Sequence, residues 1–405
     1  MSSRDHRLDA AKGVLIFMVV LGHIMAAVSP WDDASLRIFQ TAIYAFHMPA
    51  FVFLTGMTAR SGKIPHRVAF LLVLLATALP LYYGWMSMLG LEPEFDFLVP
   101  YWVTWFLLAL VWWLLTVPLI ERFPRAMLSL SLVAGLFGGL IPEYDYELSI
   151  ARALTFWPFF VIGKLYGRQI LSWAGSGGLG KRAGLLGAAL VPVGVFYAFD
   201  VEKFWFYGSR GFEFLDATIV EGSALRGIIA LGAMLSTMAV LAWVPRSAGF
   251  WAAVGRRSLA VYLLHGFMVR ALNRPLDDIL EVVPGPVMVL VCFILAALAT
   301  WFFALPIWDE GIRRYGEGVI RLATAPSMWV RATIRKGRER RAQQAEHERI
   351  GQQVLGDELS GGEVPDPQEL PAEGHGGEAL SAEGLGAEGR GAEDAARAKP
   401  ALSRR

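Results

Sequence analysis

The chain has 405 residues, of which 55% are hydrophobic, and its net charge is only +1. Soluble globular domains are usually about 45–50% apolar. Here the apolar residues gather in blocks of roughly 17–24, the length at which a helix crosses a bilayer. Composition therefore excludes a soluble globular protein and predicts an all-α, polytopic membrane helical bundle. The near-neutral charge gives no support to a nucleic-acid partner.

Ten apolar blocks are predicted to cross the membrane. In chain order they cover residues 13–28, 38–57, 68–89, 101–120, 126–141, 152–171, 183–199, 224–244, 251–271 and 286–305. The fifth block is short and rich in glycine, so its assignment depends on the charges of the connections on either side of it.

These connections alternate in charge. One set is rich in Lys and Arg, for example at 60–67 and 164–182, whereas the alternate set is mainly acidic, for example at 92–96 and 143–147. Lys and Arg gather in cytoplasmic loops, so the alternation predicts that both termini are cytoplasmic. An error of one block would break the alternation, which supports the fifth block as well.

Three regions follow one another along the chain. We expect an integral-membrane domain over residues 1–310, a charged juxtamembrane segment over 311–350 and a cytoplasmic tail over 351–405. The second region is dense in charge between Arg331 and Arg349, which suits a solvated helix or one that lies against anionic headgroups. The tail is rich in Gly, Ala and Glu and is predicted to be disordered, because it cannot bury a core.

Three histidines fall inside predicted spans: His23 in the first, His47 in the second and His265 in the ninth. Each lies roughly 10–14 residues from the cytoplasmic edge of its span, which places it near mid-bilayer or toward the outer side. Ionisable residues at that depth are candidates for function. One histidine alone could be a hydrogen-bonded packing residue, but one shared polar cavity would satisfy all three.

The first span carries a polar stripe. Lys12 and His23 are eleven residues apart, so on a helix they lie within about 20° of each other and roughly 16 Å apart along the axis. Asp9 lies on the same side, three residues before Lys12. The alternative is that Asp9 and Lys12 form a surface pair, with Lys12 extended toward the cytoplasm.

The second span contains Pro49, two residues after His47. A proline within a helix leaves one carbonyl without its usual partner. Broken helices at membrane depth are tolerated where they line a cavity or are buried in protein. The sequence therefore predicts either a plain kink or a break beside a cavity at this position.

Five short motifs accompany these residues. They are Arg7-Leu-Asp9-Ala-Ala-Lys12-Gly, Phe46-His-Met-Pro49 followed by Phe53-Leu-Thr-Gly56, Tyr101-Trp-Val-Thr-Trp-Phe106-Leu-Leu-Ala, Phe156-Trp-Pro158-Phe-Phe160-Val-Ile-Gly163, and Ser258-Leu-Ala-Val-Tyr262-Leu-Leu-His265. In order and spacing the set resembles the acyltransferase family 3 membrane proteins, especially the branch of sugar O-acetylases and glucan-modifying acyltransferases, over about residues 5–305. Many members have Arg at the position of Lys12. The charge is kept here, but bidentate recognition of a phosphate is lost.

The resemblance implies an O-acetyltransferase of the cell envelope, in the bacterial cytoplasmic membrane. It would move an acyl group, commonly acetyl from acetyl-coenzyme A, to a hydroxyl of an extracytoplasmic sugar or glycan, without a metal. Imidazole suits a general base or an acyl carrier. The expected catalytic residues are His23, Lys12 and Asp9; the expected coenzyme A contacts are Arg7, Lys12, Arg60, Lys63 and Arg67; and His47, His265 and Tyr262 are expected to bind substrate or support the site.

A secondary transporter with a histidine-lined polar path is the main alternative, because broken helices and intramembrane histidines also suit transport. No clear pair of interrupted helices is repeated in the two halves of the chain, and the stripe that ends at His23 starts at the cytoplasmic edge. A non-catalytic membrane scaffold would leave the three histidines without a role.

Overall fold

The computed structural model describes residues 5–28, 33–91, 94, 96, 98–141, 146–280 and 283–360. Within these ranges the secondary structure is helical throughout, with no strand. The α-helices are α1 (His6–Val28), α2 (Ala34–Tyr44), α3 (His47–Thr58), α4 (Ile64–Met88), α5 (Trp105–Arg122), α6 (Pro124–Phe137), α7 (Ile150–Gly175), α8 (Leu179–Ala198), α9 (Lys203–Tyr207), α10 (Ile219–Trp243), α11 (Phe250–Arg256), α12 (Ser258–Leu280), α13 (Gly285–Phe303) and α14 (Pro306–Ser360). Short 3-10 turns are η1 (Ser61–Lys63), η2 (Trp102–Thr104), η3 (Gly138–Leu140) and η4 (Glu147–Ser149).

The all-α polytopic fold predicted from the sequence is confirmed. In the described ranges, eight helical segments are long and apolar enough to cross a membrane. Two shorter apolar segments, Pro124–Leu140 and Ser258–Leu272, correspond to the fifth and ninth predicted spans. Every predicted span thus has a helical counterpart, while the count of ten membrane crossings and the cytoplasmic side of the termini stay predictions.

The second predicted span is two helices with a break between them. Helix α2 ends at Tyr44, and α3 begins at His47. Pro49 is therefore in the first turn of α3, where a missing N–H costs no helical hydrogen bond. Of the two outcomes predicted for this segment, the structure has the break, and His47 is the first residue after it.

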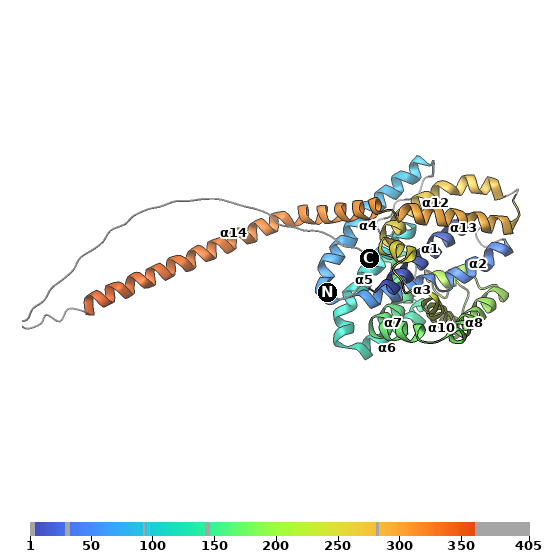
Figure 1. The fold of residues 1–405 in the computed structure, drawn as a ribbon, viewed down its shortest axis with the longest axis horizontal. Helices are drawn as coiled ribbons and strands as arrows, with labels where there is room; N and C mark the ends of the chain where they lie inside the picture. Colours follow the sequence, from blue (N-terminus) through green and yellow to red (C-terminus); the bar gives the residue numbers. More distant parts are fainter. Residues whose placement is uncertain are drawn as a thin grey trace, which may run out of the picture. The chain divides into compact units, whose positions relative to one another are not determined.

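Helix α1 lies among α2, α3, α11, α12 and α13 (Figure 1). Its closest crossing is with α11, where a Cβ added at Gly13 would meet the Trp251 carbonyl oxygen at 2.0 Å, and one added at Gly255 would meet the Asp9 carbonyl oxygen at 1.7 Å. Only glycine permits this approach of the two backbones. The crossing fixes the depth of α1 in the bundle, and with it the depth of His23.

Helices α3 and α7 also cross at glycines. A Cβ at Gly56 would lie 2.2 Å from the Phe160 carbonyl oxygen, and one at Gly163 would lie 2.1 Å from the Phe53 carbonyl oxygen. Small residues let helix backbones come close and associate by packing within a bilayer. Both glycines belong to motifs that carry the family resemblance, so part of that pattern encodes helix packing.

The chain divides into two compact units, Met1–Arg331 and Ala332–Arg405. In the second unit the described side chains, 336–353, are all exposed. Helix α14 ends at Ser360, so most of the predicted disordered tail, 351–405, lies outside the described residues. The predicted boundaries of the three regions stay predictions.

Substitution of Gly163 by alanine should destabilise the bundle, because the new Cβ would clash with the α3 backbone. Overpacking of this kind costs about 1–3 kcal/mol, which should lower the melting temperature of the detergent-solubilised protein. Gly187, on α8, has no atom within 4 Å of an added Cβ. Gly187→Ala is the matched control and should leave the melting temperature unchanged or raised. Equal melting curves for the two variants would contradict the close crossing.

Candidate active site

A cavity of about 720 Å³ lies toward the C-terminal end of α1 and contains His23 and His47 in its lining. We call it the histidine cavity. Its walls come from α1, the α2–α3 break, the segment before α5, and the helices α7, α9 and α12; they include Ala27, Tyr44, Tyr83, Tyr101, Trp102, Trp105, Tyr146, Arg152, Tyr207, Tyr262 and Arg270. Aromatic rings and cations thus surround the two imidazoles.

His23 and His265 contact each other directly, although 242 residues separate them in the chain. His23 Nδ1 lies 2.8 Å from His265 Nε2, and the planes of the two rings are 11° apart. His265 Nδ1 lies 3.0 Å from the Val261 carbonyl oxygen one helical turn earlier. The structure therefore brings together two of the three intramembrane histidines, on α1 and α12.

The partners of these imidazoles assign their tautomers. A carbonyl oxygen can only accept, so His265 Nδ1–H donates to Val261 and His265 Nε2 carries a lone pair. That lone pair accepts from His23 Nδ1–H, which leaves a lone pair on His23 Nε2. A neutral imidazole whose Nδ1–H is held by an acceptor is prepared to take a proton at Nε2.

His47 is buried in the same cavity but is oriented separately. Its Nδ1–H donates to the Ile43 carbonyl oxygen at 2.8 Å across the α2–α3 break, so its Nε2 also carries a lone pair. The Tyr44 ring packs edge-on against His47, and the Tyr44 hydroxyl donates to the Gly22 carbonyl beside His23. The break thus orients the His47 ring, and Tyr44 connects this ring to α1.

Trp102 covers the histidine pair, with its ring centre 4.9 Å from that of His23. Its backbone φ is +41°, a left-handed value that a bulky residue seldom adopts. Two other positive-φ residues, Leu148 and Ser149, immediately precede α7, near Arg152. Such backbone strain costs about 1–3 kcal/mol each and clusters at functional sites, and here it lies on both sides of one cavity.

Arg152 and Arg270 are functional candidates that the sequence analysis did not single out. Both line the histidine cavity and both act electrostatically on His23. The signal was available, because each lies within a predicted membrane span, where a charge is expensive. Tyr207 is a further polar group of the lining, and burial raises the pKa of Tyr207 to about 12, so its hydroxyl stays protonated at neutral pH.

A second cavity, of about 510 Å³, lies toward the N-terminal end of α1. We call it the Lys12 cavity. Its polar lining consists of Lys12, Thr55, Thr58, His66, Arg67, Ser258, Arg313 and Glu317, and its apolar lining includes Phe51, Phe106 and Leu110. Lys12 and His23, which the sequence places on one face of α1, therefore serve two different cavities.

Tyr262 lines both cavities and so forms part of the wall between them. Its hydroxyl donates to the Val103 carbonyl of η2, and its ring meets the edge of Phe106 on α5. Tyr262 is buried and lies one turn before His265 on α12. Tyr262, which the sequence predicted as a supporting residue, is thus the point at which the two cavities come closest to each other.

Residues 5–305 match the acyltransferase domain of acyltransferase family 3. The chain belongs to this family. The match covers nearly all of the membrane part, so the resemblance that the sequence motifs indicated is confirmed, and the protein is a multi-pass membrane acyltransferase. Membership of this family favours an enzyme over a transporter or a scaffold.

One curated relative is the nodulation protein NolL of Sinorhizobium fredii, which is 43% identical over 65 residues. That stretch is 16% of this chain and 18% of the relative, so the chain matches less than a fifth of the relative's length. No solved structure is similar to this acyltransferase.

Besides His265, which contacts His23, four predicted site residues of the acyltransferase lie outside both cavity linings. Asp9 is buried on α1, and Arg60 and Lys63 are exposed around η1. The Arg7 guanidinium donates to the carbonyls of Leu171 on α7 and Leu241 on α10. The structure therefore brings Lys12 and Arg67 together in the Lys12 cavity, while roles for these four residues stay predictions. In the described ranges no group of three or more His, Cys, Asp or Glu side chains is arranged to hold a metal ion.

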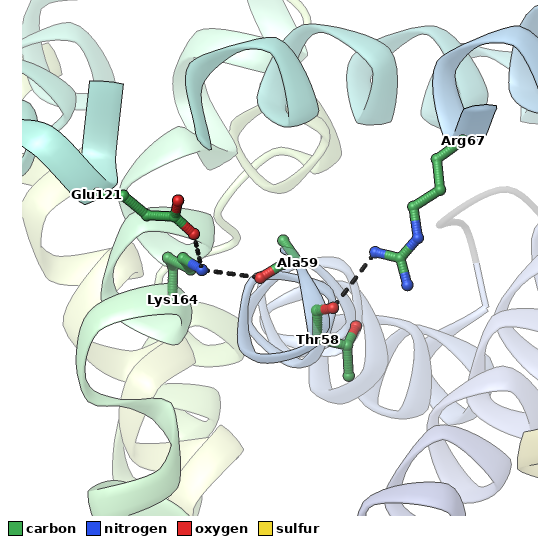
Figure 2. A network of polar contacts seen from close by, with 5 residues as sticks. All are labelled: Thr58, Ala59, Arg67, Glu121 and Lys164. Carbon is green, nitrogen blue, oxygen red and sulfur yellow. Dashed lines mark hydrogen bonds and ion pairs between the residues drawn. The ribbon is translucent and has the colours of Figure 1, made fainter. Parts of the chain in front are cut away.

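Two cations hold the C-terminal end of α3 beside the Lys12 cavity (Figure 2). Lys164 Nζ, from α7, donates to the Ala59 carbonyl oxygen at 2.8 Å and to Glu121 Oε1 at 2.7 Å. The Arg67 guanidinium donates to the Thr58 carbonyl oxygen at 3.3 Å. Cations suit a helix C-terminus, where carbonyls lack partners and the dipole is negative.

Replacement of Lys164 by methionine should lower the melting temperature of the acyltransferase, because it leaves the Ala59 carbonyl and the Glu121 carboxylate without a donor. Hydrogen bonds of charged groups contribute about 1.5–3 kcal/mol each. The control is Arg168→Met, one turn later on α7, where the side chain is exposed. A loss of stability that is no larger for Lys164→Met than for Arg168→Met would contradict the role of this network.

Proposed function

We propose that this acyltransferase moves an acetyl group from acetyl-coenzyme A, on the cytoplasmic side, to a hydroxyl of an extracytoplasmic sugar or glycan in the bacterial envelope. The observation that carries the proposal is the pair of cavities that meet at Tyr262, with the His23–His265 pair on one side and Lys12 on the other. One cavity offers a base to an acceptor, and the other offers cations to a phosphorylated donor.

The Lys12 cavity is the proposed donor site. Lys12 and Arg67 would bind the coenzyme A phosphates, since ammonium and guanidinium groups both pair with phosphate. The apolar side chains between them and Tyr262 suit the pantetheine arm. Because Lys12 and His23 are about 16 Å apart along α1, an extended arm would bring the thioester to the histidine pair. The positive loops at this end of the bundle support its assignment to the cytoplasm.

The histidine pair supplies the proposed acid–base chemistry. His23 Nε2 would accept the proton of the acceptor hydroxyl while the oxygen attacks the thioester carbonyl carbon. The C–S bond then breaks, and the proton on His23 Nε2 passes to the leaving coenzyme A sulfur. His265 would stabilise the imidazolium through its Nε2, which accepts from His23 Nδ1–H. The alternative is that His23 carries the acetyl group before the acceptor attacks.

Substitution of His23 by alanine should abolish transfer of radiolabelled acetyl from acetyl-coenzyme A to an acceptor glycan. A positioned acid–base group is worth about 10²–10⁴ in rate. The control is His347→Ala, on an exposed part of α14, which should keep full activity. Label that stays on the wild-type protein without acceptor, and is absent from His23→Ala, would select the carrier route over the base.

Transfer that survives His23→Ala would overturn His23 as the catalytic centre. Saturable solute flux into vesicles, without binding of coenzyme A, would overturn the proposed reaction and support the polar path of a transporter instead.

Loss of the His265 ring should weaken the base without removing it. His265→Leu removes the acceptor for His23 Nδ1–H, and we expect kcat to fall by about 10–100-fold, the range that a neutral hydrogen bond to a developing charge contributes. His265→Gln has a carbonyl oxygen that can accept from Nδ1–H, so it should restore part of kcat with little change in the KM for acetyl-coenzyme A. Equal rates for the two variants would show that His265 acts only by packing.

A further inference from the structure

The proposed transfer does not use two cations of the histidine cavity. Arg152 lies over the rings of Trp105 and Tyr146, with its guanidinium carbon 5.0 and 4.9 Å from their centres. Arg270 lies 4.2 Å from the centre of the Trp102 ring and 5.5 Å from that of Tyr101. Each guanidinium is therefore held against aromatic faces and lines the cavity at a fixed place.

Among the residues that the structure describes, no carboxylate neutralises either arginine. The Arg270 Nε is buried and has no hydrogen-bond partner there. A further cation, Arg210, acts electrostatically on Arg152. Half-buried positive charges without counter-ions are costly, so a bound anion would be favourable at this place.

The carboxylates of the same cavity lie at its rim. Glu94 and Asp96 are exposed, on the segment after α4. The Asp96 carboxylate accepts from the Leu98 N–H at 2.7 Å, and neither side chain pairs with Arg152 or Arg270. The deep part of the cavity is therefore positive, and the acidic groups remain near its opening.

We propose that the acceptor is an anionic saccharide, whose carboxylate or phosphate is bound by Arg152 and Arg270 while its hydroxyl lies at His23. This rests on the proposed acetyl transfer. The distances from Arg270 to the Trp102 ring and from that ring to His23 together limit the separation of Arg270 from the His23 ring to about 9 Å. The anionic group is therefore on the acetylated sugar or on its immediate neighbour.

The aromatic walls fit the same kind of ligand. Trp102, Trp105 and Tyr101 line the cavity beside the two arginines, and the guanidinium forks match the two oxygens of a carboxylate or phosphate. Arginines near the base could instead stabilise the oxyanion of the reaction itself. That role would affect every acceptor equally, whereas recognition of charge would affect only the anionic ones.

The test compares matched acceptors with the full-length protein in nanodiscs and radiolabelled acetyl-coenzyme A. Methyl glucoside is the neutral acceptor, methyl glucuronoside carries a carboxylate, and methyl glucoside 6-phosphate carries a phosphate. We expect kcat/KM to be about 10–100-fold higher for an anionic acceptor than for the neutral one, the range of one charge-assisted contact. The better of the two anionic acceptors identifies the group that is recognised.

Arg152→Gln and Arg270→Gln should remove most of this preference, whereas Arg168→Gln, an exposed arginine on the same helix as Arg152, should keep it. Binding is measured separately, as the rise in melting temperature that each saccharide produces with wild type and with both arginine variants. Selective stabilisation by an anionic saccharide that is lost in the arginine variants supports the anion site, whether or not acetyl is transferred. Such stabilisation without any transfer would overturn only the proposed reaction.

Equal kcat/KM for neutral and anionic acceptors, or an equal loss for both kinds in the arginine variants, would overturn the anion site and leave the acetyl transfer in place. If the protein transfers no acetyl group and no anionic saccharide stabilises it selectively, both proposals are overturned.

Discussion

The hydrogen bond between His23 and His265 is the interaction on which the rest of this acyltransferase depends. His265 is fully buried, so the partners of its ring nitrogens must come from the protein. Here the partners are arranged in series, from the Val261 carbonyl through His265 to His23. The series pairs both ring nitrogens of His265 and Nδ1 of His23, and it leaves a lone pair on His23 Nε2 at the histidine cavity.

This contact demands accurate helix placement, because α1 and α12 are far apart in the chain. The glycine crossing with α11 fixes the position of α1. On the side of α12, the Tyr82 hydroxyl of α4 donates to the Leu263 carbonyl of α12 at 3.0 Å, and its ring stacks on Phe267. The break between α2 and α3 then brings His47 to the same cavity. Packing at these glycines and aromatic rings therefore sets the positions of the three histidines.

The sequence predicted the helices well, and it placed the three histidines within them, since both follow from local periodicity and from the length of apolar blocks. It also predicted the disturbance at His47 and Pro49. It did not predict that Lys12 and His23 line separate cavities, because that depends on Tyr262 of α12, which lies far along the chain. The sequence analysis did not single out Arg152 and Arg270, because each lies at the end of a predicted span, where arginines commonly face the membrane surface. The left-handed backbone of Trp102 has no sequence signal, since glycine is the residue that usually marks such a conformation.

The central claim is that the donor enters by the Lys12 cavity and meets the base at Tyr262. A structure of the protein with acetonyl-coenzyme A, in which a methylene group separates the sulfur from the carbonyl carbon, tests this most directly. We expect the nucleotide phosphates to lie beside Lys12 and Arg67, the pantetheine to pass Tyr262, and the ketone carbonyl to lie next to His23. A nucleotide bound in the histidine cavity, or a carbonyl group that stays on the far side of Tyr262 from His23 when the site is full, would contradict it.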